Sequence, residues 1–284
     1  MEVTIYPIKR AARRYPAAFW GSVGFLAVLL TLALLAAYLT PYPADASGQM
    51  HFEQKLLPPS LRHLFGTDSI GRDIFTLVIY GARLSLISAF GVVGVALLLG
   101  VPLGLIAGYK GGFTENVIMR VCDAFLAFPP LLLPIIFTAA LGPSLKNAII
   151  AVAVSWFPWY VRILRAQVLA VKQAPYITAS RAMGISSLRI LYNHVLPNSF
   201  APVLVQATLD MGYAILTVAG LSFIGFGARP PAIEWGLMIT SSRATFLDFW
   251  WTAFFPGLAL FLTVFAFNLS GEGLRNILNT GDVL

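Results

Sequence analysis

Six long apolar runs dominate this sequence and limit its possible folds, since a helix needs about 20 apolar residues to cross the hydrocarbon of a bilayer. The runs cover residues 17–39, 75–107, 116–141, 148–169, 200–224 and 249–269. The composition agrees, because 58% of the residues are hydrophobic and 11% are charged, whereas soluble domains carry about 25% charged residues. The sequence therefore predicts an all-α polytopic membrane protein with six transmembrane helices.

Charge then predicts the orientation of these spans. Of the 19 lysines and arginines, twelve fall on the side of the N-terminus, six on the other side, and Arg83 lies inside the second run. Cytoplasmic loops carry the excess of such residues, so we expect both termini in the cytoplasm. The expected divisions are a cytoplasmic tail at 1–16, a retained first transmembrane helix at 17–40, an extracytoplasmic segment at 41–74 and a transmembrane domain at 75–284.

The longest predicted cytoplasmic loop, at about 171–198, contains PYITASRAMGISSLRILYNHVLPN, a basic stretch without any acidic residue. Pro175 suits the first position of a helix and Gly184 the residue just past its end, so residues 176–183 are expected to form about two helical turns. A second helical run at 186–195 is expected to end at Leu196-Pro197, where proline breaks the helix.

The first of these short helices is predicted to have small residues on one face. At 100° per residue, one face holds Tyr176, Ala179, Ser180 and Met183, whereas Ile177 and Arg181 lie on the other. An amphipathic helix resting on the membrane surface is one interpretation. A plug that docks into a partner protein is the other.

Ala179, Gly184 and the sequence VLPN at 195–198 resemble the EAA loop of permease subunits in binding-protein-dependent ABC importers. Thr178 stands where that motif often has glutamate, and Ser180 where it has its second alanine. Further segments are similar to the C-type permease of dipeptide, oligopeptide and nickel importers: FGTDSIGRDIFTLVIYGARLSL, GLIAGYKGG, DAFLAFPPLLL, RAQVL, LSFIGFG, EWGLMI and FPGLALFLTVFAFNLSGEGLR.

This resemblance implies the transmembrane domain of a type I ABC importer in a prokaryotic plasma membrane, importing a peptide-like solute. It implies four kinds of partner: a homologous permease, two ATPase subunits, an extracytoplasmic solute-binding protein and membrane lipid, with no nucleic acid. Contact with the ATPase is implied for Tyr176, Thr178, Ala179, Ser180, Arg181, Met183, Gly184, Leu196 and Pro197.

We expect no enzymatic activity in this chain itself. No lysine follows a glycine, as a phosphate-binding P-loop requires, so ATP and Mg are expected on the partner subunits and no cofactor here. The three histidines, His51, His63 and His194, are dispersed, so we expect no metal site. The alternative function is a self-sufficient secondary transporter or channel, which usually shows repeated halves, broken helices and intramembrane charges.

Several other positions remain open on sequence grounds. Asp210, without an evident local partner, either faces the translocation path or is structural, and Asp123 is expected to pair with Arg120. Gly100, Gly104 and Gly108 share a helical face that packs either within the subunit or against a second permease. Pro129, Pro130 and Pro134 are expected to kink the third span. The extracytoplasmic segment is either a solvated loop or a contact for the binding protein or gate, through Thr67, Asp68, Gly71, Arg72 and Asp73.

Overall fold

The computed structural model describes residues 17–279, and all regular structure in that range is helical. In chain order the helices are α2 (Ala17–Leu34), α3 (Ala36–Leu39), α4 (Pro43–Ala46), η1 (Phe52–Gln54), α5 (Ile74–Lys110), α6 (Gly112–Leu126), α7 (Leu132–Leu141), α8 (Leu145–Lys172), α9 (Pro175–Ala182), α10 (Ser187–Ile190), η2 (Leu191–Val195), α11 (Leu196–Ser199), α12 (Ala201–Phe223), α13 (Trp235–Ser241) and α14 (Trp251–Asn279). The tail predicted at 1–16 lies outside the described residues.

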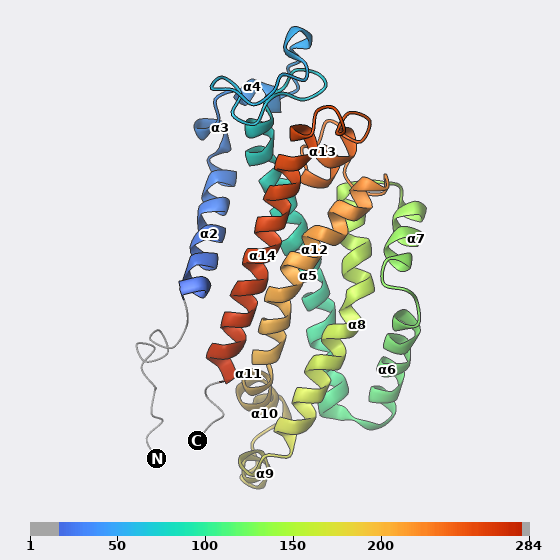
Figure 1. Cartoon of the computed structure of the whole chain (residues 1–284). Helices are drawn as coiled ribbons and strands as arrows, with labels where there is room; N and C mark the ends of the chain where they lie inside the picture. The colour runs from blue at the N-terminus through green and yellow to red at the C-terminus, as the bar shows by residue number, and fades with distance from the viewer. Residues whose placement is uncertain (1–16, 280–284) are drawn as a thin grey trace.

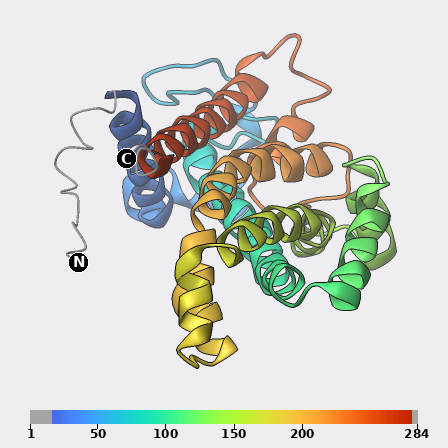
Figure 2. The same cartoon turned by 90° about the horizontal axis from the view of Figure 1, so that it is seen from below.

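Within residues 17–279, five helices are long and apolar enough to cross a membrane: α2, α5, α8, α12 and α14. They correspond to the first, second, fourth, fifth and sixth predicted runs. Figures 1 and 2 show them bundled together, with the start of α2, the end of α14 and helices α9 to α11 at one end. We call this the loop end (residues 173–200), and the opposite end the cap end (residues 40–73 and 224–250).

The third predicted span is not a single helix. Residues 127–131, which contain Pro129 and Pro130, separate α6 from α7. Two successive prolines remove two N–H donors and clash with the preceding turn, so the helix ends rather than kinks. Pro134 lies in the first turn of α7, where its N–H would have no helical partner anyway. α6 and α7 lie one above the other (Figure 1), and together they run between the two ends.

The glycine stripe of α5 packs within the subunit. A Cβ atom added at Gly104 would lie 2.8 Å from the carbonyl oxygen of Val161 in α8, and Cβ atoms at Gly100 and Gly108 would lie 2.6 and 2.7 Å from α8 side chains. Small residues let helix backbones approach closely in a membrane, where apolar burial alone does not drive association. Of the two interpretations left open by the sequence, the structure supports packing between α5 and α8.

Arg83, in the second apolar run, lies against the end of the first helix. Its Nε donates to the Ala33 carbonyl oxygen at 2.5 Å, and a terminal guanidinium nitrogen donates to the Leu34 carbonyl oxygen at 2.8 Å. The last carbonyl groups of a helix lack intrahelical donors and carry partial negative charge. The arginine therefore binds α2 to α5 without an acidic partner.

Helix α13 is capped by a buried acid at the cap end. The Glu234 carboxylate accepts hydrogen bonds from the Gly236 and Leu237 N–H groups at 2.8 and 3.0 Å. Burial raises the pKa of the Glu234 carboxyl, while these N–H donors and the Ser222 hydroxyl oppose the rise. The buried Trp235 side chain donates to the Val78 carbonyl oxygen at 2.9 Å, which docks α13 onto α5.

Candidate functional site

The loop end presents α9, which begins and ends where the sequence predicts. Pro175 is in its first turn, and Gly184 follows with a φ of 75°. The Ile185 N–H donates to the Ser180 carbonyl oxygen at 3.2 Å, closing the helix as a residue in the left-handed conformation permits. The expected stop at Gly184 is confirmed.

The outer face of α9 differs from the prediction at one position. Tyr176, Ala179 and Met183 are exposed, as expected, and Ile177 is buried. Ser180, assigned to the partner-facing side, is only 6% exposed, and its hydroxyl donates to the Tyr176 carbonyl oxygen at 2.8 Å. Because this bond satisfies the hydroxyl, the serine can face inward beside Ile177, and the exposed face is correspondingly narrower.

The second half of the loop does not break at Pro197 as predicted. α10, the π-helical turn η2 and α11 follow one another without interruption as far as Ser199. The Leu196 N–H donates to the Leu191 carbonyl oxygen, one residue farther back than in an α-helix. This wider turn lets a proline ring enter a helix that it would otherwise break. Leu196 is half-buried and Pro197 is exposed.

A cavity of about 600 Å³ lies between α6, α7, α8 and α12. The break between α6 and α7 forms part of its wall, through Phe128, Pro129 and Pro130. Irregular backbone at membrane depth is tolerated where it is buried in protein or lines a cavity. The rest of the wall includes the aromatic residues Phe125, Trp156, Trp159 and Tyr213. The rings of Trp156 and Tyr213 stack with centroids 5.2 Å apart.

Asp210 of α12 is the acidic residue of this cavity. Its Oδ2 accepts a hydrogen bond from the Tyr160 hydroxyl of α8 at 2.7 Å, and its Oδ1 accepts one from the Gln206 amide at 2.8 Å. Gln206 is four residues earlier on the same helix, so the expectation of no local partner is wrong. The carboxylate is thus fixed by two neutral donors in a wall that is otherwise mostly apolar.

Two ion pairs join α6 to α8 near the loop end. The Arg162 guanidinium donates to Asp123 at 2.6 Å, and Arg165 Nε donates to Glu115 at 2.6 Å. Asp123 therefore pairs across the helix interface and not with Arg120, the partner expected from their spacing. These pairs hold α6 against the helix that carries Tyr160.

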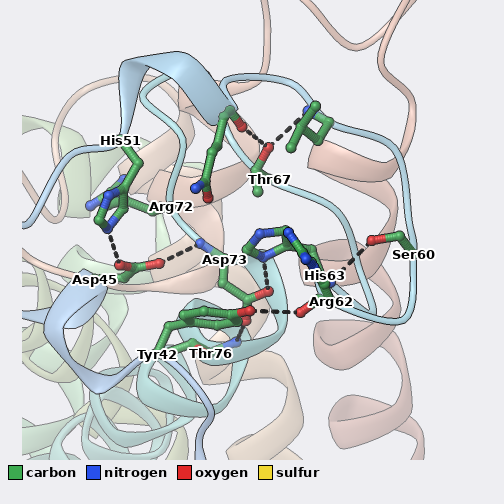
Figure 3. A network of polar contacts seen from close by, with 12 residues as sticks. Tyr42, Asp45, His51, Ser60, Arg62, His63, Thr67, Arg72, Asp73 and Thr76 are labelled. Atoms are coloured by element: carbon green, nitrogen blue, oxygen red, sulfur yellow. Dashed lines mark hydrogen bonds and ion pairs between the residues drawn. The ribbon is translucent and has the colours of Figure 1, made fainter.

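At the cap end, residues 42–76 are held by the polar network of Figure 3. Asp73 caps α5, accepting from the Thr76 N–H at 2.8 Å, and His63 Nδ1 lies 3.0 Å from its other oxygen. Asp45 accepts from the Asp73 N–H at 2.7 Å and lies 3.2 Å from His51 Nε2. Buried carboxylates are satisfied here by backbone and imidazole groups, so this part of the chain is folded rather than a solvated loop.

This network bears on the five residues that the sequence predicted to contact a binding protein or a gate. Thr67 and Asp73 are completely buried, and a Cβ atom at Gly71 would lie 1.8 Å from the His51 carbonyl oxygen. These three positions determine the fold of the segment and are not available to a partner. Asp68 and Arg72, a pair with a 2.8 Å separation, are partly exposed beside a cavity of about 300 Å³ under the cap.

Residues 100–281 match the family described as the binding-protein-dependent transport system inner membrane component. The chain belongs to this family. Within it, the dipeptide transport system permease protein DppC of Alkalihalophilus pseudofirmus is 45% identical over 253 residues, covering 89% of this chain and 83% of that protein. The glutathione transport system permease protein GsiD of Pectobacterium atrosepticum is 41% identical over 255 residues, covering 90% and 84%.

The fold of this permease is that of a solved ABC transporter. A chain from inward-facing conformations of the MetNI methionine ABC transporter superposes with a TM-score of 0.58 at 19% identity, covering 71% of this chain and 96% of that one. The likeness confirms the predicted type I importer transmembrane domain. Both the loop and the Asp210 cavity lie inside the region matched by the family, whereas the cap residues before Ile74 precede it.

Sequence reasoning missed the polar partners and the aromatic wall of the cavity. Gln206 was detectable, because residues four apart on a helix are neighbours. Tyr160 was not, because 50 residues separate it from Asp210.

Proposed function

We propose that this permease forms the translocation path of an ATP-driven importer for peptide-like solutes, together with a second, homologous permease. Its relatives supply the solute class, since they are permeases for dipeptides and glutathione. The observation that carries the proposal is the exposed outer face of α9, a rigidly terminated two-turn helix at the end of the bundle. Such a face suits a cleft in an ATPase subunit.

The chain connects this loop directly to the cavity. α8, which carries Tyr160 and Trp156, ends at Lys172, three residues before α9. α11 leads into α12, which carries Asp210. Lys172 also donates to the Tyr109 carbonyl oxygen at the end of α5, at 2.7 Å. A displacement of α9 by closing ATPase subunits would therefore move both cavity-lining helices and change the side from which the cavity is reached.

ATP and Mg are assigned to two partner ATPase subunits, and the solute arrives on a binding protein at the cap end. The rival, a self-sufficient secondary transporter or channel, leaves the exposed α9 face and the family match without an explanation. The proposal is tested by reconstituting the permease pair in liposomes with the ATPase subunits and the binding protein.

We expect the purified permease alone to hydrolyse no ATP, because it lacks a P-loop. In the reconstituted complex, peptide-loaded binding protein should stimulate hydrolysis and drive peptide uptake, measured with radiolabelled dialanine. ATP hydrolysis by the contaminant-free single chain would contradict the assignment of ATP to partners. Dialanine uptake driven by an ion gradient without ATPase subunits would support the rival.

Both termini are assigned to the cytoplasm, with the cap end outside. In a chain with Cys122→Ala, single cysteines replace Gln54 at the cap end and Gln173 at the loop end, both at exposed positions. We expect an impermeant maleimide to label position 54 in intact cells, and position 173 only after the membrane is opened. The reverse pattern would invert the orientation.

A further inference from the structure

We propose that the Asp210 cavity binds the protonated α-amino group of the transported peptide, with Asp210 as its counter-ion. This inference rests on the proposed function and adds to it a binding site inside the permease. It assigns the chain a selectivity of its own, separate from that of the binding protein.

The first observation is that Asp210 has no positively charged partner among residues 17–279. Residues 17–279 contain five close pairs of basic and acidic side chains, two of them between histidine and aspartate, and none includes Asp210. Charged groups at membrane depth are costly unless paired, and in such proteins they mark solute or ion pathways. A carboxylate has about four acceptor positions, and Tyr160 and Gln206 occupy only two. The remaining capacity suits an ammonium group brought by the solute.

The second observation is the chemistry of the surrounding wall. Trp156, Trp159 and Tyr213 present aromatic rings to the cavity, and rings of this kind attract cations over their faces. Pro129 and Pro130, also in the wall, have carbonyl acceptors but no N–H donors. The wall therefore favours a cationic, partly apolar guest over an anionic one. A cavity of about 600 Å³ lies within the usual range for small-molecule sites.

The third observation is how the carboxylate is held. The Tyr160 hydroxyl reaches it from α8, whereas Gln206 reaches it from the turn before on α12. Both are positioning residues, which fix the two oxygens without neutralising them. A purely structural bond between α8 and α12 would work equally well with a neutral amide, so the charge of Asp210 is the property to test.

The experiment uses the complete transporter complex in lipid nanodiscs, without nucleotide or binding protein, so that the cavity is probed directly. Dialanine and N-formyl-dialanine, which lacks the charged amine, are titrated while tryptophan fluorescence is recorded. Trp156→Phe and Trp159→Phe variants identify the signal from the cavity. Asp210→Asn removes the charge, Asp210→Glu retains it, and Asp248→Asn removes an exposed carboxylate at the cap end as the matched control.

We expect the wild type to bind dialanine at least about 10-fold more tightly than N-formyl-dialanine, as the loss of a charged hydrogen bond predicts. Asp210→Asn should weaken dialanine binding by a similar factor and leave the formyl peptide unchanged, whereas Asp210→Glu and Asp248→Asn should keep the preference. Equal binding of both peptides by the wild type would overturn the inference, even if Asp210→Asn failed to assemble. So would an unchanged preference in Asp210→Asn. Uptake of dialanine into liposomes by the wild type is measured separately. Uptake without a binding preference would contradict only this inference, whereas absence of uptake would contradict the proposed function.

Discussion

Gly104→Leu is expected to abolish the folded permease. The glycine lies in the close contact between α5 and α8, and even its first added carbon would be 2.8 Å from a backbone oxygen and 3.0 Å from Leu164 Cβ. Backbone atoms of a long helix cannot rotate away as a side chain can. The helices must separate, which costs about 3 kcal/mol or more by comparison with overpacked cores. Thermal unfolding and gel filtration in detergent measure the loss.

Gly94→Leu is the matched control on the same helix. No atom lies within 4 Å of a Cβ atom at Gly94, so leucine should fit and raise the local helix propensity by roughly 0.8 kcal/mol. We expect an unfolding temperature equal to or above that of the wild type. If Gly104→Leu unfolded at the wild-type temperature, the close packing of α5 on α8 would be wrong.

Ala179→Trp is expected to separate the permease from its ATPase subunits without unfolding it. Ala179 is exposed on α9, so an indole can extend away from the helix and fill the cleft proposed for it. Copurification of the ATPase with a tagged permease should fall by at least about 10-fold, the equivalent of 1.4 kcal/mol. Ala179→Ser, which adds one oxygen atom, should retain the ATPase. Normal copurification and uptake with tryptophan would instead favour a passive helix on the membrane surface.

Gly184→Val tests the direction of the same helix by another route. With a φ of 75°, a β-branched residue is strained at this position by about 1–2 kcal/mol. We expect ATP hydrolysis to become uncoupled from uptake while the long helices remain assembled. Gly184→Asn is the control, because asparagine tolerates this conformation. If both variants lost coupling equally, backbone strain would not be the cause, because asparagine relieves that strain.

Local signals predicted the bounds of the first helix of the loop, but not the structure of its second half. Pro175 and Gly184 act within one helical turn of their own positions, so the start and stop of α9 are readable from sequence. The break at 127–131 was predicted only in part. The prolines were identified, but they were expected to kink one helix, whereas the structure has two separate helices, α6 and α7. The turn at Leu191–Val195 was not predicted at all, since nothing in its composition distinguishes a π-helical from an α-helical turn.

The apolar segments, the short helix of the loop and the family resemblance can all be read from the sequence, because they depend on hydropathy and on residues close together in the chain. Helix packing, in contrast, determines which side of α9 is free, buries Thr67 and Asp73, and pairs Asp123 with Arg162. It also brings the Tyr160 hydroxyl within 2.7 Å of the Asp210 carboxylate, 50 residues away in the chain. Contacts of that kind depend on how helices rotate about their axes when they pack, and hydropathy that is nearly uniform around a membrane helix does not specify this rotation.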